Sequence, residues 1–87
     1  MSTIKKKLTV KIKQGLHARP AALFVQVANK FDSRITVRRG QEEINGKSIM
    51  GILMLGAEFG SSIIIEADGP DAQSALAELD RIISKED

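Results

Sequence analysis

The first part of the chain alternates between apolar and polar positions. Leu8, Val10 and Ile12 are each followed by a polar side chain, which is lysine in two of the three cases. An alternation with period two is typical of a β-strand that buries one face and exposes the other. We therefore expect a strand over this segment, with a basic outer face, that ends at Gln14-Gly15.

The pattern changes to a helical period after this strand. Apolar residues then recur every three or four positions: Ala21, Phe24 or Val25, Ala28 and Phe31. This spacing places them on one face of a helix. Pro20 suits the first turn, where a missing N–H costs nothing. The helix is predicted to begin at residue 17 or 18 and to fade near Phe31.

Two β-structures are predicted in the rest of the chain. Residues 35–44 have apolar positions on both sides of a polar stretch, and Gly40 within that stretch predicts the turn of a β-hairpin. The isoleucine run of residues 63–65 is typical of a central strand, because β-branched side chains suit the interior of a sheet.

A short helix is predicted between these two β-structures. Residues 45–47 read as a turn, and Ser48 then precedes an apolar run that ends at Leu55. Serine is a preferred N-cap, because its hydroxyl accepts a hydrogen bond from a backbone N–H in the first turn. Gly56 is suited to close the helix.

The last helix follows a turn at residues 68–71, with Pro70 expected at its first position. Its apolar stripe is Ala72, Ala75, Leu76, Leu79, Ile82 and Ile83. The predicted order is therefore β-α-β-β-α-β-α in a single domain, residues 1–87. This order favours a two-layer α/β sandwich with the helices on one face of the sheet. The other face is left to solvent, which antiparallel sheets tolerate.

Composition narrows the possible functions. The chain has 87 residues, no cysteine and one histidine, so disulfides, cysteine nucleophiles and multi-histidine metal sites are excluded. No apolar run reaches the length of a membrane span and no signal peptide is visible, so we expect a cytoplasmic protein without membrane association. A complete enzyme is not expected, because so small a domain has little interior for a substrate cleft.

The charges are unevenly distributed. Residues 1–39 carry ten basic side chains and one acidic, which gives +9, whereas residues 40–87 carry three basic and ten acidic, which gives −7. Such asymmetry fits a nucleic-acid interface or docking onto acidic proteins. Because the chain has three phenylalanines and no tyrosine or tryptophan, base-stacking platforms are scarce, and direct nucleic-acid binding is the weaker interpretation.

His17 is the first candidate for chemistry, because it ends a glycine-containing loop and begins a predicted helix. Backbone N–H groups and the dipole at a helix start favour anions such as phosphate. Arg19 adds the forked donors that suit phosphate. These features predict a nucleophilic imidazole beside a phosphate site. The alternative is a surface or capping histidine without chemistry.

Ser48 is the second candidate. As an N-cap alone it contributes about 1 kcal/mol. As a phosphorylation site, it would gain from the helix N-terminus and from Lys47. Gly46-Lys47-Ser48 also imitates the end of a P-loop, but five residues rather than four separate Gly40 from Gly46. Nucleotide binding at this position is therefore rejected.

The short helix that follows Ser48 has more apolar residues than it can bury. Ile52 and Leu55 are expected in the core. The remaining residues are expected to form an exposed apolar patch beside Ser48, which is typical of a partner-binding surface. They are Ile49, Met50, Leu53 and Met54.

Two segments resemble the signatures of a known family. Residues 15–21, GLHARPA, and residues 45–51, NGKSIMG, are similar to those of HPr, the histidine-containing phosphocarrier protein of the bacterial phosphoenolpyruvate:sugar phosphotransferase system. The resemblance extends from about Lys7 to Ser84. It implies an α+β fold, an open-faced β-sandwich with a four-stranded antiparallel sheet covered on one face by three helices, and no cofactor or metal.

The resemblance also implies roles for single residues. His17 matches the histidine that accepts a phosphoryl group on Nδ1 from enzyme I and passes it to the IIA domain of a sugar permease. Arg19 matches the arginine beside it, and Ser48 matches the serine that HPr kinase/phosphorylase phosphorylates with ATP. The implied partner-binding residues are Ile49, Met50, Leu53, Lys47 and Pro20. Methionine is common in this branch where this chain has Leu53.

Three functions are compatible with these observations. The first is a monomeric phosphocarrier, a substrate of its partner enzymes rather than an enzyme, regulated at Ser48. The second keeps the fold but acts mainly as a Ser48-phosphorylated corepressor of a catabolite-control transcription factor. A paralogue in this branch has glutamine in place of the histidine, so His17 favours the carrier. The third, a nucleic-acid-binding module, rests only on the basic first half.

Overall fold

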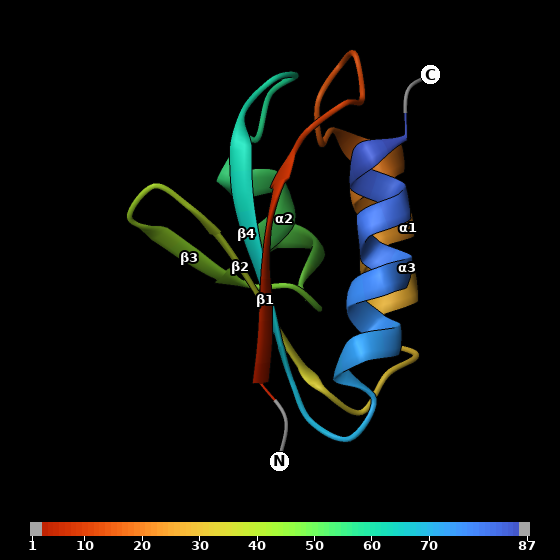
Figure 1. The fold of residues 1–87 in the computed structure, drawn as a ribbon. Coiled ribbons are helices and arrows are strands. Elements are labelled where there is room, and N and C mark those ends of the chain that lie inside the picture. Colours follow the sequence, from red (N-terminus) through yellow and green to blue (C-terminus); the bar gives the residue numbers. More distant parts are fainter. Residues whose placement is uncertain (1–2, 86–87) are drawn as a thin grey trace.

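Four strands form one antiparallel sheet, and three helices lie against one face of it (Figure 1). The structure, a computed structural model, describes residues 3–85. The elements in chain order are β1 (Thr3–Thr9), α1 (Ala18–Ala28), β2 (Arg34–Arg39), β3 (Glu42–Asn45), α2 (Ile49–Leu55), β4 (Ser62–Asp68) and α3 (Ala72–Ser84). The predicted fold class and the predicted order of elements are confirmed.

Strand β4 lies inside the sheet, as its isoleucine run predicts. The strand order is β1-β4-β2-β3, and every neighbouring pair is antiparallel. Ile63 pairs with Leu8 of β1, and Ile65 pairs with Val37 of β2. All four of these side chains are buried beneath the helices. The sheet therefore joins the first part of the chain to its last third.

Strand β1 lies earlier in the chain than the alternation predicted. It ends at Thr9, because its partner β4 begins at Ser62, which pairs with Thr9. Val10 and Ile12 are nevertheless buried, at 0% and 6% exposure. Beyond the strand, the amide of Val10 donates to the carbonyl of Ser61 at 2.9 Å. The alternation thus predicted burial correctly but not the limits of strand pairing.

The helix starts show one confirmed and one wrong prediction. Helix α1 begins at Ala18, with Pro20 in its first turn, as expected. Pro70, by contrast, is not the first residue of α3, because Asp71 is the N-cap. The amide of Ala72 closes a turn onto Gly69 at 3.4 Å, and bonding of the helical type starts with the amide of Ala75 donating to Asp71 at 3.0 Å. Pro70 therefore belongs to the turn.

The core lies between the sheet and the helices. Its largest fully buried side chain is that of Phe24 in α1. The apolar stripe predicted for α3 is buried except at Ile82, which is half-buried. Helices α1 and α3 run antiparallel beside each other, so that the start of α1 and the end of α3 lie at the same end of the molecule (Figure 1). None of the helices in residues 3–85 combines the length and apolar composition that crossing a bilayer requires.

Candidate functional site

His17 is the N-cap residue of α1, and it is exposed to solvent. Its backbone is extended, with φ −92° and ψ −165°, and its imidazole makes no capping hydrogen bond. The amide of His17 donates to the carbonyl of Gly15 at 2.9 Å, and its carbonyl accepts from the amide of Ala21 at 2.8 Å. The backbone is therefore held on both sides, while the imidazole is left available for chemistry.

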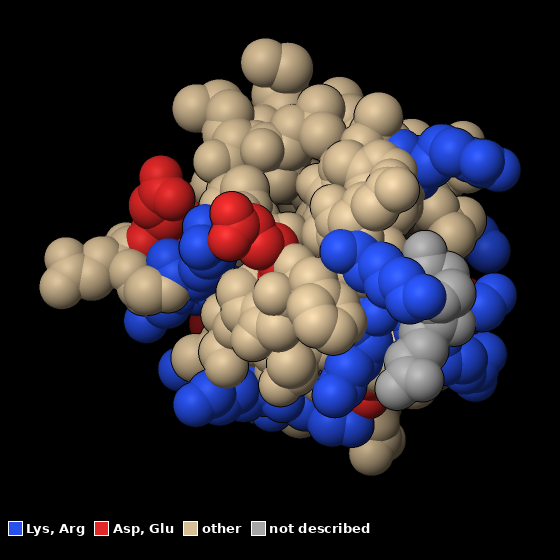
Figure 2. Space-filling view, turned by 90° about the horizontal axis from the view of Figure 1, so that it is seen from above, with Lys and Arg blue, Asp and Glu red and all other residues tan. Residues whose placement is uncertain are grey.

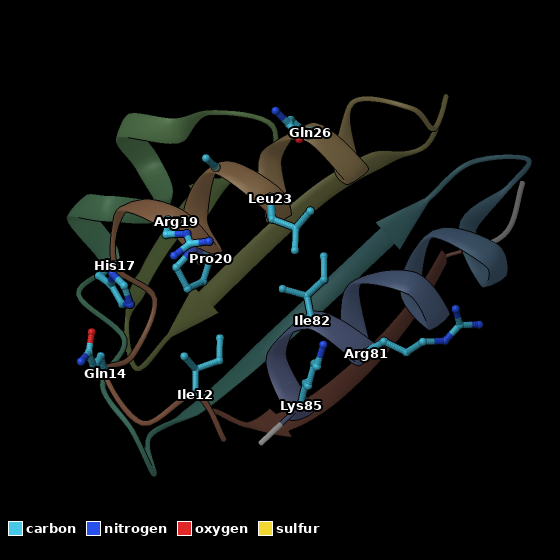
Figure 3. Close-up of a pocket in the computed structure, with 11 residues that line it drawn as sticks. Ile12, Gln14, His17, Arg19, Pro20, Leu23, Gln26, Arg81, Ile82 and Lys85 are labelled. Carbon is cyan, nitrogen blue, oxygen red and sulfur yellow. The ribbon is translucent and has the colours of Figure 1, made fainter. Parts of the chain in front are cut away.

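The first amides of α1 are also available. Within residues 3–85, the N–H groups of Ala18 and Arg19 have no hydrogen-bond acceptor, and Pro20 carries no N–H. Because the His17 side chain does not cap the helix, both amides can bind an anion beside the ring. The exposed side chain of Arg19 lies beside the same space as His17 (Figure 3). The structure thus brings together the imidazole, the helix N-terminus and the arginine.

The loop that carries His17 is anchored to the loop after α2. Leu16 is buried at 4% exposure, and its amide donates to the carbonyl of Ala57 at 2.9 Å. The second loop is tied back in turn, because the amide of Gly60 donates to the carbonyl of Val10 at 2.8 Å. Gly15, at the bend, has a left-handed φ of +78°. His17 is therefore presented from a fixed backbone.

Ser48 caps α2, as its sequence position predicts. Its Oγ accepts a hydrogen bond from the amide of Gly51 at 3.1 Å. Gly56 ends the helix with a left-handed φ of +62°. Arg39 adds a contact that the sequence did not reveal, because its Nη1 donates to the carbonyls of Leu55 and Gly56, each at 3.1 Å. Both ends of this short helix are therefore capped.

Lys47 precedes Ser48, but its side chain has a partner elsewhere. Its Nζ donates to the carbonyl of Phe31 at 2.7 Å. Asn29, at the end of α1, donates to the carbonyl of Lys47 at 3.3 Å. The ammonium group therefore links the turn before α2 to the loop after α1, and a phosphate on Ser48 would have to compete with the Phe31 carbonyl for it.

Helix α2 divides its apolar side chains as predicted. Ile52 and Leu55 are buried, at 0% and 1% exposure. The side chains of Met50 and Met54 are 63% and 72% exposed. Ile49 and Leu53 are also exposed, and these four residues form what we call the α2 patch. Because α2 packs against α1, the patch belongs to the helical layer that also carries His17.

An open depression of about 870 Å³ runs from His17 along the junction of α1 and α3. The sequence did not predict the α3 side of this depression, which includes Ile82 and Lys85. One feature of the sequence indicated an exposed apolar side chain here, because Leu23 falls outside the buried stripe of α1. Its side chain is 48% exposed. Phe59, in the loop after α2, was also missed and is 59% exposed.

Basic side chains are frequent at this end of the molecule. Figure 2 views it from above and shows lysines and arginines mainly along the lower and right-hand sides, with acidic groups toward the left. Within residues 3–85, no cluster of three or more histidine, cysteine, aspartate or glutamate side chains could hold a metal ion. The groups of the site that can bind an anion are the backbone amides of Ala18 and Arg19 and the cationic side chains.

Residues 4–85 match the family described as the PTS HPr component phosphorylation site. The chain belongs to the HPr family. It is 46% identical over 83 residues to the HPr-like protein Crh of Halalkalibacterium halodurans, across 95% of this chain and 99% of that protein. It is also 46% identical over 68 residues to the phosphocarrier protein HPr of Treponema pallidum, across 78% and 77% of the two chains.

Solved structures of HPr have the same fold. The crystal structure of HPr from Bacillus anthracis is similar with a TM-score of 0.92 and 43% identity, over 97% of this chain and all (100%) of that one. Another, described as an HPr dimer from Thermoanaerobacter tengcongensis, has a TM-score of 0.70 and 49% identity, over 85% of this chain and 87% of that one. The expectation of a monomer is therefore not supported by these comparisons.

Proposed function

We propose that this protein accepts a phosphoryl group on Nδ1 of His17 from phosphorylated enzyme I and passes it to IIA domains of sugar permeases. The observation that carries this proposal is the exposed imidazole, which makes no capping hydrogen bond, at the start of α1. In each transfer, the bond from phosphorus to the donor breaks as the bond to the acceptor forms. A cytoplasmic location is part of this proposal.

The groups around His17 suit a carrier better than a hydrolase. The amides of Ala18 and Arg19, with the Arg19 guanidinium, offer charge-assisted hydrogen bonds to phosphoryl oxygens. Phosphoryl transfer in kinases and ATPases relies on metal ions that neutralise the developing charge. Stabilisation by amides and one arginine is more modest, so the phosphoryl group can be held and then released to a partner.

The proposal is tested by phosphorylation with purified enzyme I and phosphoenolpyruvate. We expect intact-mass spectrometry to show the gain of one acid-labile phosphoryl group, and the His17→Ala variant to show none. Ser48→Ala is the matched control, because it keeps the imidazole and removes the other candidate acceptor. Phosphorylation of His17→Ala to the level of wild type would refute the assignment.

We also propose that Ser48 is a regulatory phosphorylation site. A phosphate on its Oγ would remain at the helix N-terminus and would add about two negative charges beside the exposed side chains of Met50 and Ile49. Those charges would repel an acidic partner that approaches the α2 patch. HPr kinase/phosphorylase with ATP should modify wild type and leave Ser48→Ala unmodified. Modification at another residue would contradict the assignment.

The second candidate is a regulatory protein that acts as a Ser48-phosphorylated corepressor of a catabolite-control transcription factor. The similarity to the HPr-like protein Crh over 95% of this chain favours it. The presence of His17 favours the carrier instead. A chain that enzyme I leaves unmodified, but that binds the transcription factor once Ser48 is phosphorylated, would establish the regulatory function in place of the carrier.

A further inference from the structure

The depression beside His17 continues well beyond the phosphate site. We call it the α1–α3 groove. Its apolar lining consists of Ile12, Pro20, Ala22, Leu23 and Ile82. Leu23 of α1 and Ile82 of α3 point toward one another across it (Figure 3). Leu23 is 48% exposed and Ile82 is half-buried, so both present apolar surface to solvent.

The charged groups of the groove have one sign. Within residues 3–85, its charged side chains are Arg19, Arg81 and Lys85, and none of the aspartates and glutamates in that range lines it. Lys85 extends from the end of α3 toward the middle of the groove, whereas Arg81 extends away from it (Figure 3). Because the start of α1 also lies here, its helix dipole adds to the positive potential. Together with the two open amides, the groove favours an acidic occupant.

The apolar centre distinguishes between kinds of acidic occupant. A nucleic acid strand gains from aromatic platforms, and no aromatic side chain lines the groove. An anionic membrane binds apolar groups that protrude into it, whereas Leu23 and Ile82 line a depression. A protein segment with carboxylates around one apolar side chain complements both the charge and the shape.

We propose that the α1–α3 groove docks an acidic protein segment that inserts one apolar side chain between Leu23 and Ile82. The proposal rests on the phosphocarrier function, and the segment belongs to a protein that exchanges a phosphoryl group with His17. Helix α1 contacts both α2 and α3. The groove therefore adds a second contact surface to the α2 patch, and Ser48 does not line the groove.

Kinetics of phosphoryl transfer test the groove directly. Leu23→Gln removes the apolar contact but keeps a good helix former, and Lys85→Glu reverses a groove charge. The control, Lys30→Glu, makes the same charge reversal at an exposed position that does not line the groove. With enzyme I or with a IIA domain as partner, we expect both groove variants to raise KM about tenfold at unchanged kcat, and Lys30→Glu to stay within about twofold.

KM values of both groove variants within twofold of wild type, for both partners, would overturn the proposal. Phosphorylation of wild-type His17 in the same assay reports separately on the phosphocarrier function.

If a variant fails to fold, an NMR titration replaces the kinetics. Each partner is added to ¹⁵N-labelled His17→Ala, and the shifts of the amide signals are recorded. Shifts of the Gln26 and Ile82 amides support the groove, and their absence with both partners overturns it. Shifts of these amides with phosphatidylglycerol vesicles but with neither protein would also overturn it.

Discussion

The backbone of Gly15 lies directly against the carbonyl of Ala57. A Cβ atom on Gly15 would stand 2.7 Å from that oxygen, closer than van der Waals contact allows. The same oxygen accepts the hydrogen bond from Leu16 at 2.9 Å. The position of His17 therefore depends on a contact between two distant loops that only glycine permits.

Replacing Gly15 with alanine is expected to lower the free energy of unfolding by about 2–3 kcal/mol, because a left-handed φ and a steric contact both oppose the side chain. Gly40→Ala is the matched control. Gly40 has φ +62°, but a Cβ atom there would meet nothing within 4 Å, so about 1 kcal/mol is expected. Urea denaturation measures both values. Equal losses would show that the Ala57 contact does not matter.

Asp71 joins the start of α3 to the loop before β2. Its carboxylate accepts hydrogen bonds from the Ser33 hydroxyl and from the amides of Asp32 and Ser33. These bonds, above all those from the Ser33 hydroxyl and the Asp32 amide, hold the pKa of Asp71 below its ordinary value of 3.8. The stability they provide is therefore present above pH 3.8 and is lost as the pH falls through the lower folded-state pKa.

We expect Asp71→Asn to melt at a lower temperature than wild type near neutral pH. The difference should shrink as the pH falls below 3.8, because the wild-type carboxylate is then protonated. A melting difference that is constant with pH would contradict this assignment. Asp80→Asn is a useful comparison, since hydrogen bonds from Lys6 and Ser84 also lower the pKa of Asp80.

A double-mutant experiment tests the hydrogen bond between Ser33 and Asp71. Ser33→Ala should lower the melting temperature less in the Asp71→Asn background than in wild type, because the two side chains share this hydrogen bond.

Ser48 allows stability and regulation to be separated. Ser48→Ala removes the hydrogen bond to the Gly51 amide and should cost about 1 kcal/mol in urea denaturation. Ser48→Asp retains a capping acceptor and should restore most of that stability, yet it should slow transfer from enzyme I at low salt. If Ser48→Asp accepted the phosphoryl group as fast as wild type, repulsion at the α2 patch would not be the regulatory mechanism.

The α2 patch should contribute to partner binding and little to folding. Met50→Gln and Met54→Gln are each expected to change the unfolding free energy by no more than about 0.5 kcal/mol, because both side chains are largely exposed. Ile52→Ala in the same helix should cost about 2–5 kcal/mol, because Ile52 is fully buried. Calorimetric titration with enzyme I measures binding. Unchanged affinity of the two glutamine variants would remove the patch from the docking surface.

Features with a local cause could be predicted from the sequence. The caps of α2 depend on hydrogen bonds within a few residues of Ser48 and Gly56, so their residue types were sufficient evidence. The start of α1 at Ala18 was predictable for the same reason. The extent of β1 and the place of Pro70 were not, since the first depends on where β4 begins and the second on the turn at Gly69.

The sequence by itself determined the order of the elements, the buried faces and the candidate chemistry at His17 and Ser48, because periodicity and short motifs encode these features. Only the tertiary structure decided that Lys47 binds the carbonyl of Phe31 and that Gly15 rests on Ala57. The tertiary structure also decided that Leu23 and Ile82 face each other across one groove. Such contacts join residues far apart in the chain, and their positions follow from packing the three helices and the sheet around a shared core.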